Sequence, residues 1–155
     1  MKRLEGYENV GNVLHILAEF HRGLAGFFEN TGKAVTDERM RMMLAHLVKH
    51  QRQRAVALEN YQRDAPATLL KSWLQIPFPE NPGSFLELLG EQNGMTVEAL
   101  QQLLSRVDGF VSQLLHHLET RAESANVEAL FHDLHEIDNR ERLLRSRALS
   151  SFSQI

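Results

Sequence analysis

The segment Asp64–Met95 reads DAPATLLKSWLQIPFPENPGSFLELLGEQNGM and separates two pairs of helix-like segments. It contains all four prolines of the chain, yet it is rich in large apolar side chains rather than in the polar residues of a flexible linker. Such a segment gains free energy when it packs on the rest of the protein. We therefore expect it to cover the side of a helical bundle and to cross from one end to the other. The alternative is an up-and-down bundle in which the same segment forms a decorated loop.

Four longer segments flank this connection, and each repeats apolar residues with the 3.6-residue period of an amphipathic helix. We predict helices at about residues 8–34, 37–63, 96–122 and 126–152. The loops within each pair are short, which makes the paired helices antiparallel neighbours. The expected architecture is an all-α four-helix bundle that forms a single domain over residues 1–155, with the crossover at residues 64–95.

Residues that favour helix ends mark several boundaries. Thr36 and Thr96 each precede a predicted helix, where a hydroxyl can accept a hydrogen bond from a free backbone N–H. Within the connection, Ser84 and Glu87 have the spacing of a capping box, which predicts that a short helix starts there. No segment has a convincing β-strand pattern, so the sequence predicts helices and loops alone.

Composition excludes several classes of function. The 17 basic and 20 acidic residues give a net charge of −3, whereas a broad nucleic-acid surface needs concentrated Lys and Arg. Cysteine is absent, which excludes disulfides, thiolate catalysis and Cys-ligated metals. No secretory signal follows Met1 and no stretch approaches the ~20 apolar residues of a membrane span, so we expect a cytoplasmic protein. No nucleophile stands beside a base and no phosphate-binding loop is present, so the sequence favours no enzyme class.

The stretch Leu14–Asp64 reads LHILAEFHRGLAGFFENTGKAVTDERMRMMLAHLVKHQRQRAVALENYQRD. It resembles the first helical hairpin of small bacterial ferritin-like proteins of unassigned function, within the ferritin/rubrerythrin-like superfamily. In that hairpin an aromatic-rich helix end is followed by a short break, then by Asp-Glu, here Asp37-Glu38, and a second helix. The resemblance implies a ferritin-like bundle, in which one long crossover joins the second and third helices. It implies iron chemistry only where the ligands match.

The residues at the expected di-iron positions do not match. Ferritin-like di-iron centres take a Glu from each of two helices and a Glu-x-x-His from each of the other two. The inward positions here hold His21, Gln51, Arg54, Asp138 and Glu141. Arg54 keeps its proton and repels a metal cation, so we interpret these residues as a buried polar layer in which Arg54 pairs with Asp138 or Glu141. The di-iron ligands are therefore largely missing.

A second hypothesis is a non-standard metal site built from other histidines and carboxylates. The candidate ligands are His21, Asp108, Asp138 and Glu141 inside the bundle, and His46 and His50 on its surface. His46 and His50 lie four residues apart, a helical spacing that can hold a zinc ion. His132 and His135 form a further candidate pair. The adjacent His116 and His117 point in different directions, which favours a partly buried histidine over a metal ligand.

The preferred hypothesis is a ferritin-like bundle without a standard di-iron site that serves as a non-catalytic binding or interaction protein. Under this hypothesis no cofactor is expected. We expect a homo-oligomer, specifically a homodimer, and a protein partner, with neither nucleic acid nor a membrane as partner. The alternative is the metal-binding protein described above, with iron or zinc as the metal. The metal content of the untagged protein separates the two hypotheses.

Overall fold

Four long helices form the body of the protein. The computed structural model describes residues 3–4, 6–76, 78, 80–90 and 94–153. The long helices are α1 (Val10–Lys33), α2 (Glu38–Asp64), α5 (Val97–Thr120) and α6 (Ala125–Ser153). Each starts and ends at most two residues from the bounds predicted from the sequence. Pro77, Pro79 and the two ends of the predicted domain lie outside the described residues.

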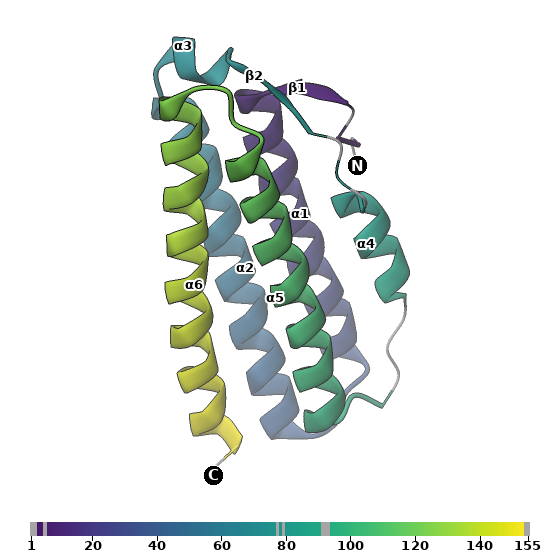
Figure 1. The fold of residues 1–155 in the computed structure, drawn as a ribbon. Coiled ribbons are helices and arrows are strands. Elements are labelled where there is room, and N and C mark those ends of the chain that lie inside the picture. Colours follow the sequence, from purple (N-terminus) through teal and green to yellow (C-terminus); the bar gives the residue numbers. More distant parts are fainter. Residues whose placement is uncertain (1–2, 5, 77, 79, 91–93, 154–155) are drawn as a thin grey trace.

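The connection between α2 and α5 passes along the full length of the bundle. Figure 1 shows α1 and α2 as one antiparallel pair and α5 and α6 as another, with α5 running parallel to α2. The chain leaves α2 at one end of the bundle and enters α5 at the opposite end. The predicted crossover is therefore confirmed, and the up-and-down alternative is wrong.

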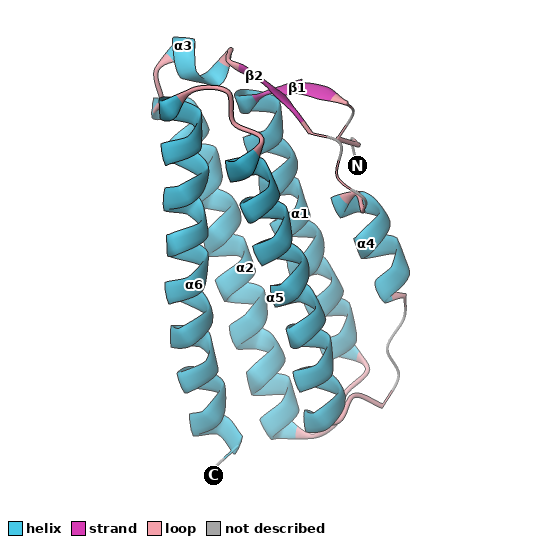
Figure 2. Ribbon diagram, in the orientation of Figure 1, coloured by secondary structure: helices cyan, strands magenta, loops and turns pink. Residues whose placement is uncertain are grey.

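Short elements divide the crossover. They are α3 (Ala67–Leu70), β2 (Trp73–Gln75) and α4 (Pro82–Leu89). β2 pairs with β1 (Tyr7–Asn9), an antiparallel ribbon at the end of the bundle where α2 finishes. Figure 2 shows this ribbon above the helices. The sequence did not predict it, because three-residue strands are too short to show an alternating pattern.

Two helix starts follow from capping side chains. The Thr96 hydroxyl accepts a hydrogen bond from the Ala99 N–H at 3.1 Å, as the sequence predicts for the start of α5. The cap of α2 is Asp37 rather than Thr36, because the Asp37 carboxylate accepts the Met40 N–H at 3.0 Å. A carboxylate at this position also suits the positive end of the helix dipole.

The start of α4 differs from the predicted capping box. The helix begins at Pro82, which suits a first helical turn because proline has no backbone N–H to satisfy. The preceding Asn81 is the N-cap residue, but its side chain makes no capping hydrogen bond to the helix. Its side chain instead accepts the Leu4 N–H at 2.7 Å and donates to the Leu4 carbonyl at 3.2 Å. Ser84 therefore lies inside the helix, and Asn81 ties the N-terminal segment to the crossover.

Aromatic packing fixes α4 against the bundle. The ring of Phe85 stacks on Phe110 of α5, with centroids 4.5 Å apart, and meets Phe20 of α1 edge-on at 6.0 Å. Gly23 of α1 allows this close approach, because a Cβ atom there would lie 2.5 Å from the Leu86 side chain. Apolar side chains of the crossover are thus part of the hydrophobic core.

The interior is apolar over most of its length. Its largest fully buried side chains include Phe20, Phe28, Phe131, Leu14 and Ile16. A band of polar and charged residues interrupts this core. Among the described residues, no helix has both the length and the apolar character required to cross a bilayer.

We predict that Phe85→Ala lowers the free energy of unfolding by about 3–5 kcal/mol, because it leaves a cavity between the crossover and the core. Urea denaturation followed by circular dichroism measures this change. Leu88→Ala on the same helix is the matched control, because Leu88 is 68% exposed and its truncation should cost less than about 0.5 kcal/mol. Equal, small effects of both substitutions would mean that α4 does not pack as described.

Candidate functional site

His21 and Gln51 join α1 to α2 in the interior. Both side chains are buried, and His21 Nδ1 lies 2.6 Å from Gln51 Oε1, so the imidazole N–H donates to the amide carbonyl. Burial lowers the pKa of His21 to about 3, and the charge of Arg54 acts in the same direction. His21 is therefore a neutral hydrogen-bond donor near pH 7.

Arg54 of α2 faces Asp138 of α6 across the bundle. Arg54 Nη2 lies 3.5 Å from Asp138 Oδ1, and the two side chains are only 11% and 8% exposed. Arg142 approaches the same carboxylate, with Nε 3.4 Å from Asp138 Oδ2, although these two atoms are not aligned as a hydrogen bond. The sequence offered Asp138 or Glu141 as the partner of Arg54, and the structure pairs Arg54 with Asp138.

A second ion pair lies between α5 and α6. The Arg145 guanidinium donates two hydrogen bonds to Asp108, from Nη1 to Oδ1 at 2.9 Å and from Nη2 to Oδ2 at 2.6 Å. Arg145 is buried, and this two-point geometry is the strongest form of an arginine–carboxylate contact. Asp108, a metal candidate from the sequence, is thus occupied by a cation of its own chain.

Glu141 lies at the edge of this region rather than within it. Its side chain is 38% exposed, and Oε2 lies 3.3 Å from His50 Nε2. The sequence places Glu141 in the buried layer, whereas the structure leaves its side chain half-buried at the rim beside His50. We define the polar layer by the buried and half-buried residues that meet here, namely His21, Gln51, Arg54, Asp108, Asp138, Arg142 and Arg145.

Removal from water dominates the electrostatics of the polar layer. Burial raises the pKa of the Asp138 carboxyl although Arg54 and Arg142 oppose the shift, and burial lowers the pKa of Arg54 although Asp138 opposes it. The buried atoms without a hydrogen-bond partner among the described residues are His50 Nδ1, Arg54 Nη1, Asp138 Oδ2, Arg142 Nε and Arg145 Nε. The ion pairs therefore mainly offset a desolvation cost.

The polar layer does not fit a di-iron centre. Such a centre needs carboxylates and imidazoles that are free to hold two metal cations. Here Asp108 is bound by Arg145, and Asp138 faces Arg54 and Arg142. Three guanidinium groups next to the site would repel added positive charge. We therefore derive no iron chemistry from these residues.

Among the described residues, the remaining metal candidates from the sequence bring together one pair, His50 and Glu141, and no group of three. His50 contacts Glu141, whereas the His46 ring packs edge-on against Phe152 with centroids 6.0 Å apart. Within the described part of the chain, the group of three His or carboxylate side chains close enough to share one ion is a different one. It consists of His116, Glu119 and His135, whose ligand atoms all lie within 4.8 Å of one another. We call it the hairpin cluster.

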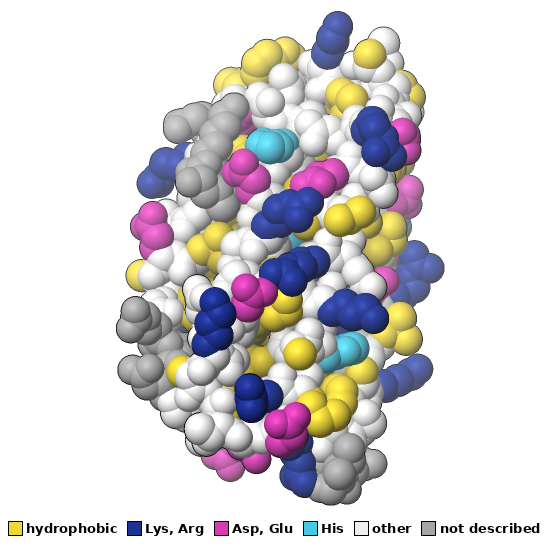
Figure 3. All heavy atoms as spheres, turned by 180° about the vertical axis from the view of Figure 1, so that it is seen from behind, with side chains coloured by type: hydrophobic (Ala, Val, Ile, Leu, Met, Phe, Trp, Pro, Cys, Tyr) yellow, Lys and Arg dark blue, Asp and Glu magenta, His cyan; other side chains and the backbone are white. Residues whose placement is uncertain are grey.

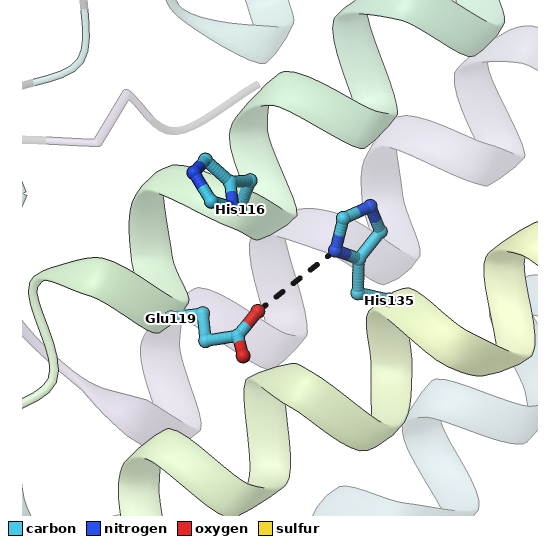
Figure 4. A group of neighbouring side chains, drawn as sticks. All are labelled: His116, Glu119 and His135. Carbon is cyan, nitrogen blue, oxygen red and sulfur yellow. Dashed lines mark ion pairs between the residues drawn. The ribbon is translucent and has the colours of Figure 1, made fainter.

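The sequence named His135 as a candidate, set His116 aside as part of the His116–His117 pair, and did not name Glu119. Figure 4 shows His116 and Glu119 on α5 turned toward His135 on α6. Counting from the turn does not pair these positions, because residues 116 and 119 lie four residues and one residue before the end of α5, whereas residues 135 and 132 lie ten and seven residues after the start of α6. His132 adjoins the group, and its Nδ1 lies 2.8 Å from Glu119 Oε1.

A groove runs along the outer face of α1 and α2. It encloses about 840 Å³. Its lining is Phe28, Glu29, Gly32 and Lys33 of α1, and Arg41, Leu44, Ala45, Val48, Lys49, Arg52, Gln53, Val56, Ala57 and Asn60 of α2. Figure 3 shows basic side chains spread over a face of the molecule with apolar side chains between them. We call the groove lined by these residues of α1 and α2 the α1–α2 groove.

Comparison with known proteins supports the fold. A solved structure of a candidate ferritin-like diiron-carboxylate protein from Thermotoga maritima superposes with a TM-score of 0.61, covering 97% of this chain and 98% of that chain. The two sequences are 12% identical, so the match establishes a shared ferritin-like fold and not a shared activity. No protein-family model matches the chain, and no curated protein matches it.

We predict strong coupling between Arg54 and Asp138. Arg54→Met and Asp138→Leu should each lower the free energy of unfolding by about 3 kcal/mol, because each removes one side of a buried ion pair and leaves the other charge less well compensated. The double variant should lose less than either single variant, because it removes both charges. A double-mutant cycle by urea denaturation measures the coupling. Additive effects would show that the two side chains do not form a pair.

We predict that His21 makes the fold sensitive to acid. The unfolded chain takes up a proton near the ordinary pKa of 6.5, whereas the folded chain resists protonation down to about 3. The free energy of unfolding should therefore fall by about 2 kcal/mol from this residue alone between pH 7 and pH 5. In His21→Gln this part of the fall should disappear, as measured by urea denaturation at both pH values. His15→Gln, at an exposed position, is the control, and equal slopes in both variants would refute the prediction.

Proposed function

We propose that this protein is a ferritin-like binding protein that holds an acidic, amphipathic helix of a partner protein in the α1–α2 groove. The observation that carries the proposal is an apolar groove with a basic rim. Under this proposal the bundle interior serves as structural support and performs no oxidase chemistry. The ion-paired polar layer supports that second part, because its carboxylates are matched by guanidinium groups.

The dimensions of the groove suit a helix. Its lining on α2 extends from Arg41 to Asn60, which corresponds to about 28 Å at 1.5 Å per residue. The floor between α1 and α2 is apolar, and Val56 is 45% exposed although it is a large hydrophobic residue. Binding of an amphipathic helix in such a groove is a recurrent mode of protein recognition. A partner helix would bury the exposed apolar side chains of the floor.

The rim favours an acidic partner. Four basic residues and one acidic residue line the groove, whereas the whole chain has a net charge of −3. Arg52 is neutralised by Glu29, with Nη2 2.5 Å from Oε2. Lys33 and Lys49, in contrast, make no ion pair with any described residue. Complementary charge on the partner would guide its approach and fix its orientation.

The charge of the rim disfavours a second copy of this chain as the occupant. A two-fold dimer would place the same basic face on both sides of the interface, and like charges would then meet. The homodimer predicted from the sequence would have to use another face. The groove is therefore assigned to a partner protein rather than to self-association.

We predict that a synthetic helical peptide of about 18 residues, long enough to span the groove, binds the purified protein. The peptide carries leucines on one face and glutamates on both flanks. Fluorescence anisotropy of the labelled peptide should show saturable binding with one peptide per chain. Lys49→Glu should weaken binding at least about tenfold, because it reverses an unpaired rim charge. Arg147→Glu, an exposed basic position of α6 outside the groove, should leave binding unchanged.

Three outcomes would refute this function. The first is equal binding of a control peptide with lysine in place of glutamate. The second is that laurate, an anionic amphiphile, saturates the groove while the acidic peptide does not bind. The third is a dimer in sedimentation experiments that Lys49→Glu dissociates, since a second copy would then be the occupant.

A further inference from the structure

The hairpin cluster lies apart from both the polar layer and the α1–α2 groove. Its residues belong to the α5–α6 hairpin, near the turn that joins those two helices. His116 is exposed, and Glu119 and His135 are half-buried. Nothing in the polar layer or in the proposed docking of a partner helix uses these side chains. Their convergence therefore calls for its own explanation.

Neighbouring groups orient two members of the hairpin cluster. His135 Nε2 lies 3.0 Å from the Ser112 hydroxyl, so this nitrogen is engaged on the side away from the cluster. His135 Nδ1 faces Glu119 Oε2 at 3.9 Å. The other carboxylate oxygen, Glu119 Oε1, lies 2.8 Å from His132 Nδ1. His135 Nε2 and Glu119 Oε1 are thus held in place by outer contacts. The remaining atoms, His135 Nδ1 and Glu119 Oε2, face each other.

Support of this kind is typical of metal ligands. A histidine that binds a metal through one ring nitrogen usually hydrogen-bonds through the other, and a ligating carboxylate is itself hydrogen-bonded. Ser112 and His132 provide those two outer contacts. A surface ion pair between Glu119 and His132 alone would not require His116, which makes no hydrogen bond with the described residues.

We propose that His116, Glu119 and His135 bind a divalent zinc ion. Two imidazole nitrogens and one carboxylate oxygen suit zinc, and three protein ligands leave a fourth position for water or an external ligand. Ligands about 2.1 Å from a tetrahedral ion lie about 3.4 Å apart. The ligand atoms, within 4.8 Å of one another, need to close by roughly 1 Å, which rotation of the exposed His116 side chain can provide.

Bound zinc would connect α5 to α6 close to their turn. The ion would join two ligands from α5 to one from α6, so it would bind the folded hairpin and not the unfolded chain. By mass action, zinc should therefore raise the midpoint of thermal unfolding. This effect is independent of the peptide groove, so the two proposals can fail separately.

The test is titration of the untagged full-length protein with ZnCl₂ by isothermal calorimetry in a buffer that does not chelate zinc. We expect one Zn²⁺ per chain and a higher thermal unfolding midpoint in its presence. His116→Ala and Glu119→Gln should each weaken binding at least about tenfold. Both substitutions lie near the surface, so the folded state should persist, and circular dichroism checks this. His46→Ala, a histidine outside the cluster, is the control and should bind as the parent protein does.

Two results would overturn the assignment. One is the absence of saturable zinc binding by the parent protein. The other is zinc binding that His116→Ala and Glu119→Gln leave unchanged, because the ion would then be held by other histidines. If His46→Ala alone weakens binding, the site belongs to the surface of α2 and this proposal is wrong.

Discussion

The interior of this bundle holds the guanidinium group of Arg54, which stays protonated, and the neighbouring side chains have to balance its charge. The Arg54 guanidinium is almost fully removed from water and keeps its proton at any physiological pH. Such a group is tolerated only beside a carboxylate, which commits Asp138 to Arg54. Asp108 is committed to Arg145 in the same way. The two carboxylates of the polar layer are therefore used for charge balance and are not free for metal.

The fold does not depend on those interior ligands. Apolar side chains fill the core on both sides of the polar layer, and the crossover adds Phe85 against Phe20 and Phe110. A bundle stabilised in this way keeps its architecture with different residues in the middle, provided that the buried charges among them are paired. The chain shares a ferritin-like fold with a structure to which it is 12% identical, so this fold does not require a common set of residues.

The sequence predicts the features that arise from long-range periodicity and misses those that depend on contact between distant segments. Repeating apolar positions over long segments located the four long helices, and the apolar connection after Asp64 indicated the crossover. The β1–β2 ribbon could not be foreseen, because it forms only when the crossover reaches Tyr7–Asn9. The hydrogen bond between Asn81 and Leu4 could not be predicted either, since the two residues are far apart in the chain. The inward position of Arg54 in the sequence pattern did predict that a carboxylate lies beside it.

The candidate sites illustrate the same limit. Glu141 was placed in the interior because its spacing from Asp138 fits the inner stripe, but the rotation of α6 leaves it at the rim. His116 was set aside because it adjoins His117 in the chain. His117 in fact bonds to the Ile76 carbonyl of the crossover, while His116 turns toward α6. The relative register of α5 and α6 brings the hairpin cluster together, and no single helix contains that information.

The central claim is that guanidinium groups, and not metal ions, engage the carboxylates of the polar layer. The most direct measurement is anaerobic loading of the untagged His135→Ala variant with Fe²⁺, followed by metal analysis and oxygen uptake after admission of air. This variant removes the hairpin cluster as a source of bound iron. We expect no iron retained in proportion to the chain and no oxygen consumption above that of free Fe²⁺. Two iron ions per chain, lost on Asp138→Asn, would contradict the account.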